Sequence, residues 1–332
     1  MPADGVVQSA FRDAAPPLTF AHCIVGRARC FVLPCVQRSI ATNVMDALPG
    51  TSTSFVHLSV PSNKTNWKEK SNVPNVAPSF RPDEIDFVRG AVERFRRFAN
   101  VGAVWVGPDE PMPVAVLAVA AKDPEFPAHF QMWRNVRGCF ELVLQHEETA
   151  RRRFSFVSRI RPDAVFFSSW VLPPDFAQLG GMFIPKGGLG CSTCANDHLA
   201  LVPRAAAHRY FRDIFEEYSA CKNGTCASIH RKGFARRPSH PFAPPRGGAS
   251  YVYHAVGLEI LPTHIPYALA NHELAYTGEN LTLGCHRLSV HSDFRHRMPY
   301  EKAGGYAVDN TSFADTIRNL RHLCGQWSCA DS

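Results

Sequence analysis

The chain has 332 residues, 45% of them hydrophobic, and a formal net charge of +7. This hydrophobic share is enough for a substantial buried core, and no stretch approaches the roughly 18–20 apolar residues that a membrane-spanning helix needs. The positive charge suits an anionic ligand, but no known nucleic-acid-binding motif occurs. We therefore expect one large domain, or one and a half, without a transmembrane segment and without a nucleic-acid partner.

The first 60 residues predict a parallel α/β unit. Residues 1–17 are expected to form a tail, and Leu18–Val25 predicts a buried strand. Phe31–Leu48 carries apolar residues at helical spacing up to a Pro-Gly pair, and Ser54–Val60 predicts a second strand. A strand–helix–strand succession is typical of a parallel sheet covered by helices.

The alternation of strands and helices continues further along the chain. Residues 61–82 are polar and rich in proline, which indicates a surface loop, and residues 107–127 mix prolines with an apolar run that has no clear periodicity. Between and after these loops the pattern predicts two amphipathic helices, Asp83–Phe98 and Ala128–Arg151, and two strands, Gly102–Val106 and Phe154–Ser158.

The pattern weakens in the second half of the chain. It predicts a strand near Met182–Ile184, a helix from about Asp197 to Tyr218, and a strand at Val252–Leu261. The expected organisation is a tail at 1–17, a core at 18–218, a Cys-, Pro- and base-rich loop at 219–250, and an irregular C-terminal extension at 251–332 that completes the core.

Cysteine and asparagine patterns favour an oxidising compartment. The chain has 11 cysteines, and a glycosylation sequon at Asn223 lies between Cys221 and Cys226. Disulfides, glycosylation and the secretory-pathway lumen, in the Golgi or the ER, are therefore expected. No basic segment followed by an apolar one occurs near the start, so a cytoplasmic location stays open. A zinc site formed by Cys191 and Cys194 with another pair is the competing interpretation.

The first candidate binding segment follows the first predicted strand and spans Gly26 to Arg29. Glycine permits close approach of the backbone to a ligand, and a guanidinium can bind a pyrophosphate with two donors. Gly26, Arg27 and Arg29 are therefore candidates for binding a phosphorylated ligand, and the alternative is a tight turn with solvated arginines. The segment lacks a G-x-G-x-x-G pattern, which counts against a dinucleotide-binding Rossmann site.

The second candidate segment runs from Arg159 to Asp163 at the end of a predicted strand. Arg159 and Arg161 share one face of an extended chain, and Pro162 ends the strand. Asp163 then lies just past a strand end, where open α/β sheets bind ligands. A carboxylate beside fixed cations suits a diphosphate bound through Mg²⁺ or Mn²⁺, whereas a strand-end salt bridge is the simpler alternative.

The third candidate segment runs from Asn196 to Arg204. Asp197 could accept the proton of an acceptor hydroxyl, and the alternative is that Asn196 or Asp197 caps the helix predicted to follow. Arg204 could bind phosphate or pair with Asp163. The histidines of the C-terminal third do not have the spacing of an HExxH-type zinc site.

Taken in order, these segments resemble the nucleotide-sugar glycosyltransferases of GT-A-like fold, and more narrowly a poorly characterised algal and plant set. The resemblance covers about residues 18–218 and rests on four segments in matching order. They are Ala21–Arg29, Trp133–Leu142 together with Glu147, Phe154–Asp163, and Asn196–Arg204. The resemblance implies a Rossmann-like, mostly parallel sheet flanked by helices.

By that resemblance, the first strand and its turn hold the nucleotide, and Asp163 replaces the last acid of the family's Asp-x-Asp metal motif. The first position of this triplet is Arg161 in this chain, which puts metal dependence in question because an arginine can itself neutralise a diphosphate. Asp197 falls where many such folds place an acid on the acceptor side.

The implied activity is transfer of a sugar from a nucleotide-diphosphate donor to a hydroxyl of a glycan, a protein or a small molecule. Arg27, Arg159 and Arg161 are the candidates for stabilising the leaving diphosphate. The rival hypothesis is a non-catalytic protein that binds a nucleotide sugar or a glycan on the same scaffold, since the acidic triplet is incomplete. A basic, zinc-stabilised nucleic-acid-binding protein is a third hypothesis, which explains none of the acids at strand ends.

Overall fold

The computed structural model describes the core of the chain and a few short segments of its C-terminal part. The described residues are 17–60, 82–120, 126–166, 168–188, 191–195, 198–220, 257, 259–263, 267–269, 274–277 and 280–283. Among the helices of these residues, none is both long enough and apolar enough to cross a membrane.

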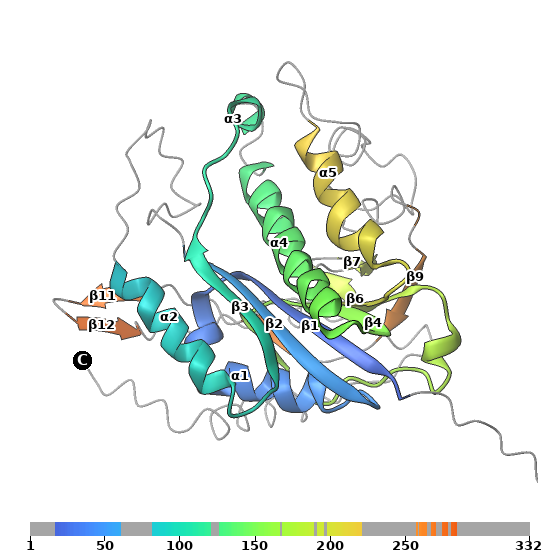
Figure 1. The fold of residues 1–332 in the computed structure, drawn as a ribbon. Coiled ribbons are helices and arrows are strands. Elements are labelled where there is room, and N and C mark those ends of the chain that lie inside the picture. The colour runs from blue at the N-terminus through green and yellow to red at the C-terminus, as the bar shows by residue number, and fades with distance from the viewer. Residues whose placement is uncertain are drawn as a thin grey trace, which may run out of the picture.

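The core of the molecule is a mixed eight-stranded sheet in the order β3-β2-β1-β4-β8-β6-β7, with β9 paired to β6 (Figure 1). Its strands are β1 Thr19–Arg27, β2 Thr51–Val60, β3 Val101–Pro108, β4 Phe156–Ile160, β6 Met182–Gly188, β7 Cys191–Ala195, β8 Leu199–Pro203 and β9 Ile260–Thr263. The strands β1 to β4 are mutually parallel. β8 runs antiparallel to both β4 and β6, whereas β9 is parallel to β6.

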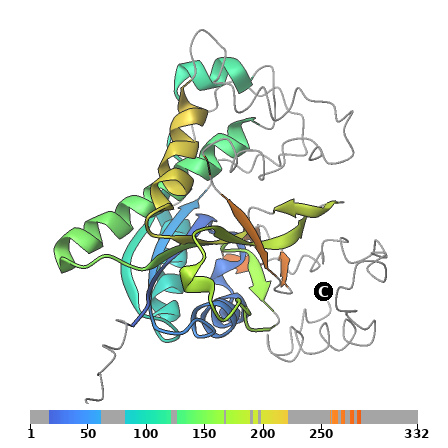
Figure 2. The ribbon, with the colours of Figure 1, turned by 90° about the vertical axis from the view of Figure 1, so that its right-hand side faces the viewer.

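Helices cover both faces of this sheet (Figures 1 and 2). α1 (Pro34–Ile40) and α2 (Pro82–Phe95) lie on one face, and α4 (Phe126–Ala150) and α5 (Ile214–Ser219) lie on the other. α3 (Val114–Ala120) follows β3 and projects beyond the edge of the sheet. Two small antiparallel pairs complete the described strands: β5 (Ala164–Phe166) with β10 (Tyr267–Leu269), and β11 (Leu274–Thr277) with β12 (Asn280–Leu283).

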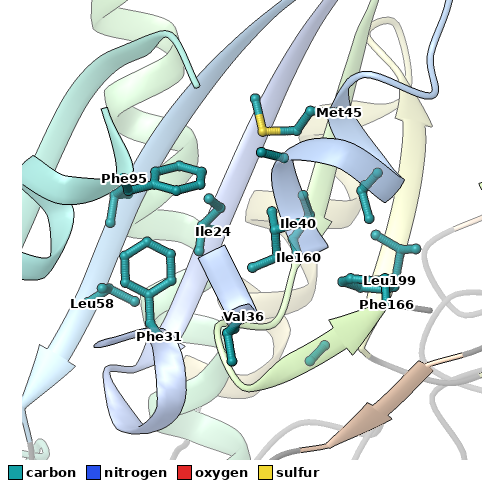
Figure 3. Close-up of a cluster of buried hydrophobic side chains, with 14 of the residues drawn as sticks. Ile24, Phe31, Val36, Ile40, Met45, Leu58, Phe95, Ile160, Phe166 and Leu199 are labelled. Carbon is teal, nitrogen blue, oxygen red and sulfur yellow. The ribbon is translucent and has the colours of Figure 1, made fainter. Parts of the chain in front are cut away.

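The two faces of the sheet bury separate apolar cores because side chains alternate along each strand. On the α1/α2 face, Ile24, Leu58 and Ile160 pack against the two helices, and Phe31 meets Phe95 edge to face with ring centroids 5.3 Å apart (Figure 3). On the opposite face, a second core is formed with α4 and with the π-helical segment Arg209–Asp213 that leads into α5. Its members include Cys23, Phe55, Val157, Trp133, Phe140 and Phe211.

The structure confirms the predicted α/β alternation from β1 to β4. Of the four apolar positions predicted to face inward on α2, Val88, Val92 and Phe95 are buried, and Ile85 is half-buried against the same core. The unassigned run at 107–127 contains α3. The predicted helix from Asp197 to Tyr218 is wrong in its first part, because Leu199–Pro203 forms β8 and helical structure begins only after it.

The strand order places a topological switch point between β1 and β4. From β1, the chain builds outward to β2 and β3 on one side, and then returns to add β4 on the other side. In open α/β sheets, ligands bind outside the carboxyl ends of the strands at such a point. The carboxyl ends of β1 and β4 are Arg27 and Ile160, which are the two places where the candidate segments begin.

Candidate functional site

Gly26 and Pro162 are in contact at the carboxyl ends of β1 and β4. A Cβ atom added to Gly26 would lie 3.2 Å from Cδ of Pro162, and the backbone of Gly26 has φ +143°. That conformation favours glycine. Two candidate segments more than 130 residues apart in sequence therefore meet at the switch point, as their strand-end positions predict.

Arg161 and Asp163 form a two-pronged ion pair on either side of Pro162. Nε of Arg161 donates to Oδ1 of Asp163 at 2.8 Å, and Nη2 donates to Oδ2 at 2.7 Å. The Asp163 side chain is 2% exposed, whereas that of Arg161 is 23% exposed. The carboxylate therefore faces the interior, and the guanidinium lies between it and the surface.

Arg27 lies at the same edge and reaches across to the end of β3. Its Nη2 is 3.7 Å from Oδ2 of Asp109, with 37% of the Arg27 side chain and 17% of the Asp109 side chain exposed. Asp109 is held beyond β3 by its backbone N–H, which donates to the carbonyl of Val60 at 3.3 Å. A solvent-facing cation and a partly buried carboxylate thus lie side by side over β1 to β3.

A row of polar side chains continues from this pair into α4. Asn135 donates through Nδ2 to Oγ of Ser59 at 3.0 Å, and Gln131 donates through Nε2 to Oδ1 of Asn135 at 3.1 Å. Ser59 is the β2 neighbour of Arg27 in the parallel register. Oε1 of Gln131 and Oδ1 of Asp109 are buried and accept no hydrogen bond from the described part of the chain. A buried acceptor without a donor is costly, which makes both atoms candidates for contact with a ligand.

Arg134 connects this row to the segment after β3. Its Nη1 donates to the carbonyls of Glu110 and Pro111 at 2.9 and 3.1 Å. Burial lowers the pKa of Arg134, and the carboxylates of Glu110 and Asp109 partly offset that effect. Arg134 therefore holds the segment that follows β3, which contains Asp109.

Arg159 lies on β4, two residues before Arg161, and is buried inside the protein. Its side chain belongs to the largest fully buried ones, its guanidinium carbon is 5.4 Å from the ring centroid of Trp133, and Nη1 lies 3.5 Å from Oη of Tyr210. The aromatic face stabilises the buried cation. The structure thus corrects the prediction that Arg159 binds the ligand, because α4 covers this position.

Arg204 lies at the opposite edge of the sheet. β8 is antiparallel to β4, so Leu199 pairs with Ile160 and Pro203 pairs with Phe156, which carries Arg204 to the amino end of β4. There its Nε and Nη2 donate to Glu147 at distances of 2.6 to 3.1 Å. The predictions that Arg204 binds phosphate at this site or pairs with Asp163 are therefore wrong, because the direction of β8 separates them.

Two predicted site residues cannot be placed. Asp197 lies outside the described residues, and so does the side chain of Arg29, whose backbone belongs to a short 3₁₀ turn. The neighbour of Asp197, His198, is at the switch-point edge, where its carbonyl accepts the N–H of Arg161 at 2.9 Å. Asp197 therefore stays a prediction, next in sequence to a residue at this edge.

The described residues do not fit a divalent cation on Asp163. Both carboxylate oxygens accept hydrogen bonds from Arg161, and no group of three or more His, Cys, Asp or Glu side chains among the described residues could hold a metal ion. The other described carboxylates that we place at this edge, those of Asp109 and Glu110, follow β3 and lie three strands away, which is about 14 Å at the usual strand spacing. Asp163 lies just past the end of β4, as predicted, but it is buried against Arg161, so the structure supports the strand-end salt bridge and not the predicted metal ligand.

Sequence reasoning missed Asp109, Gln131 and Asn135. Asp109 carried the same signal as Asp163, an acid just beyond a predicted strand, and it could have been found by applying that rule to every strand. Gln131 and Asn135 are four residues apart on α4 and share a face. No spacing rule connects them with Ser59.

Comparison with known proteins adds no relative from which a function could be transferred. No protein-family model matches the chain, and no curated protein sequence matches it. The resemblance to GT-A-like glycosyltransferases therefore depends on the four sequence segments quoted above.

Proposed function

We propose that this chain is a glycosyltransferase that moves a sugar from a nucleotide-diphosphate donor to a hydroxyl acceptor. The observation that carries the proposal is the contact between Gly26 and Pro162 at the switch point. It brings Arg27 and Arg161 to one edge of a mixed α/β sheet, at the position where such sheets bind phosphorylated ligands.

The chemistry requires stabilisation of the leaving diphosphate. Breaking the bond between sugar and phosphate gives a transition state with oxocarbenium character and leaves negative charge on the diphosphate. Preorganised cations at the position where charge develops lower that barrier. Arg27 and Arg161 fill this role in our proposal, and Asp197 is the proposed base for the acceptor hydroxyl.

Asp109 and Gln131 give the ligand an orientation along the edge of the sheet. A carboxylate repels phosphate but accepts hydrogen bonds from hydroxyl groups. Because Asp109 neighbours Arg27, the group that it binds is the one next to the diphosphate, which in a nucleotide is the ribose. The nucleoside would then lie over β2 and β3, and the sugar would lie towards β4.

The alternative proposal is a protein that binds a nucleotide sugar or a glycan without catalysis. The observation in its favour is that Asp163, the predicted acid of the site, is buried against Arg161. If Asp197 has no part in catalysis either, none of the acids that we assign to this site supplies a base for the acceptor.

Calorimetric titration with a panel of nucleotide sugars tests the common part of both proposals. We expect binding by the wild type, at least tenfold weaker binding by Arg27→Ala, and unchanged binding by Arg89→Ala, a matched control on the surface of α2 where Arg89 pairs with Asp86. Absence of binding at millimolar concentration would rule out both proposals.

Transfer assays then separate the enzyme from the binding protein. With the donor that binds best and a panel of hydroxyl acceptors, Asp197→Asn is expected to retain donor affinity and lose at least a hundredfold in turnover, the usual scale for removal of a general base. Donor binding without turnover in the wild type would favour the binding protein.

We further propose that the protein matures in the secretory lumen. Cys35 takes part in a disulfide bond, whereas the thiols of Cys23 and Cys139 are free and buried. Titration of free thiols on protein from its natural compartment decides the matter. A count below the 11 cysteines of the chain is expected, and eleven free thiols would place it in a reducing compartment.

A further inference from the structure

The Arg161–Asp163 pair has the geometry of a preorganised anion-binding group. The two hydrogen bonds, at 2.8 and 2.7 Å, join the fork of the guanidinium to both oxygens of one carboxylate. Such bidentate pairs fix the orientation of the guanidinium plane as well as its position. Asp163 is the buried member and Arg161 the more exposed one, so the guanidinium is the part of the pair nearer to the surface.

The backbone around the pair is also fixed. The N–H of Arg161 donates to the carbonyl of His198 at 2.9 Å, and the carbonyl of Arg161 accepts from Ala164 at 3.3 Å. Pro162 has a restricted φ and packs against Gly26. Little conformational freedom is left to lose when a ligand binds, which favours affinity.

A divalent cation on Asp163 would have to displace Arg161. Coordination requires carboxylate oxygens at about 2.0–2.6 Å from the ion, and both oxygens of Asp163 already accept charge-assisted hydrogen bonds. Displacing the fork would break both bonds and bring a strongly hydrated ion to a side chain that is 2% exposed. The arrangement therefore disfavours metal binding at the position where the family resemblance implies it.

We infer that the chain binds the diphosphate of its donor without a divalent cation, and that Asp163 is a positioning residue that holds Arg161 in the place of the metal. This inference rests on the proposed function. Arg27, at the end of the neighbouring strand, supplies the second guanidinium. The ligand class is thus a nucleoside diphosphate recognised by two guanidiniums.

Titration of wild-type protein with UDP, GDP and ADP, each in EDTA and in Mn²⁺ or Mg²⁺, tests the inference without any variant. At least one nucleotide is expected to bind, with a dissociation constant that changes less than threefold between the two conditions. Binding that requires the cation would overturn the inference and leave the proposed function standing. Absence of binding in both conditions would overturn the proposed function, and the inference with it.

Variants test the positioning role of Asp163. In EDTA, Asp163→Asn should bind the nucleotide about tenfold more weakly, and added Mn²⁺ should not restore affinity. Asp86→Asn, which removes the acid of a surface pair on α2, is the matched control and should bind normally. If Asp163 were a metal ligand, Arg161→Ala would keep cation-dependent binding, a result that contradicts the inference.

Chemical rescue separates positioning from a merely structural role. Guanidinium ion at millimolar concentration should restore part of the nucleotide binding of Arg161→Ala, because Asp163 still offers both oxygens to it. It should not rescue the double variant that also carries Asp163→Asn. Equal rescue of both variants would show that Asp163 does not position the cation.

Discussion

Replacement of Gly26 by alanine tests the junction of β1 and β4, on which the proposed site depends. The added Cβ would lie 3.2 Å from Cδ and 3.4 Å from Cγ of Pro162, and it would have to be accommodated at φ +143°. A non-glycine residue in such a backbone region costs about 1–3 kcal/mol. We therefore expect Gly26→Ala to lose about 1–3 kcal/mol of unfolding free energy and to bind nucleotide more weakly, since Pro162 and its neighbour Arg161 must shift.

Gly180→Ala is the control, because no heavy atom outside Gly180 and its two chain neighbours lies within 4 Å of the added Cβ. Its unfolding free energy should stay within about 0.5 kcal/mol of the wild type. The assays are urea unfolding and calorimetric titration of the same preparations. A Gly26→Ala variant as stable as Gly180→Ala, or one that is destabilised but keeps its nucleotide affinity, would show that the junction of β1 and β4 does not shape the binding site.

Three further predictions follow from individual contacts. Burial lowers the pKa of His22 to about 3, so the folded protein keeps this ring neutral while the unfolded chain protonates it below about pH 6.5. The unfolding free energy should therefore decrease as the pH is lowered from about 6.5 to 3, by up to ~1.4 kcal/mol per pH unit. The decrease should be smaller in His22→Gln, and equal pH slopes of the wild type and this variant in urea titrations would contradict the prediction. Arg204→Met should destabilise the fold by about 3 kcal/mol, because it leaves the buried Glu147 carboxylate without its ion-pair partner. The double variant that also carries Glu147→Gln should recover most of this loss, and thermal unfolding that shows no recovery would contradict the role of the pair. Asp109→Ala should reduce the preference for ribo- over 2′-deoxyribonucleoside diphosphates by about tenfold, the equivalent of one hydrogen bond to a charged group, and an unaltered preference in calorimetry would remove Asp109 from the ribose site.

The first half of the fold could be predicted because its determinants are local. Each strand from β1 to β4 is a short apolar run bounded by turn residues, and α2 and α4 show helical periodicity on one face. The segment Leu199–Pro203 could not be assigned in this way. A short apolar run fits a buried strand as well as a buried helix, and only pairing with β4 decides for the strand.

The same distinction holds for the candidate site. Gly26 and Asp163 could be brought together from sequence, because parallel strands present their carboxyl ends at one edge. The position of Arg204 could not, since it depends on the direction of β8, which no local pattern reveals. The burial of Arg159 could not be predicted either, because a charged residue is normally expected at the surface. Only the fold shows that the aromatic side chains of Trp133 and Tyr210 surround it.

Hydrogen exchange with and without a saturating nucleotide diphosphate tests most directly whether the switch-point edge is the binding site. We predict slower amide exchange at residues 26–28, 59–60, 109–110, 161 and 163–164, which lie far apart in sequence and meet at the carboxyl ends of β1 to β4. Protection confined to the opposite edge, around residues 147–155 and 204, would contradict this prediction.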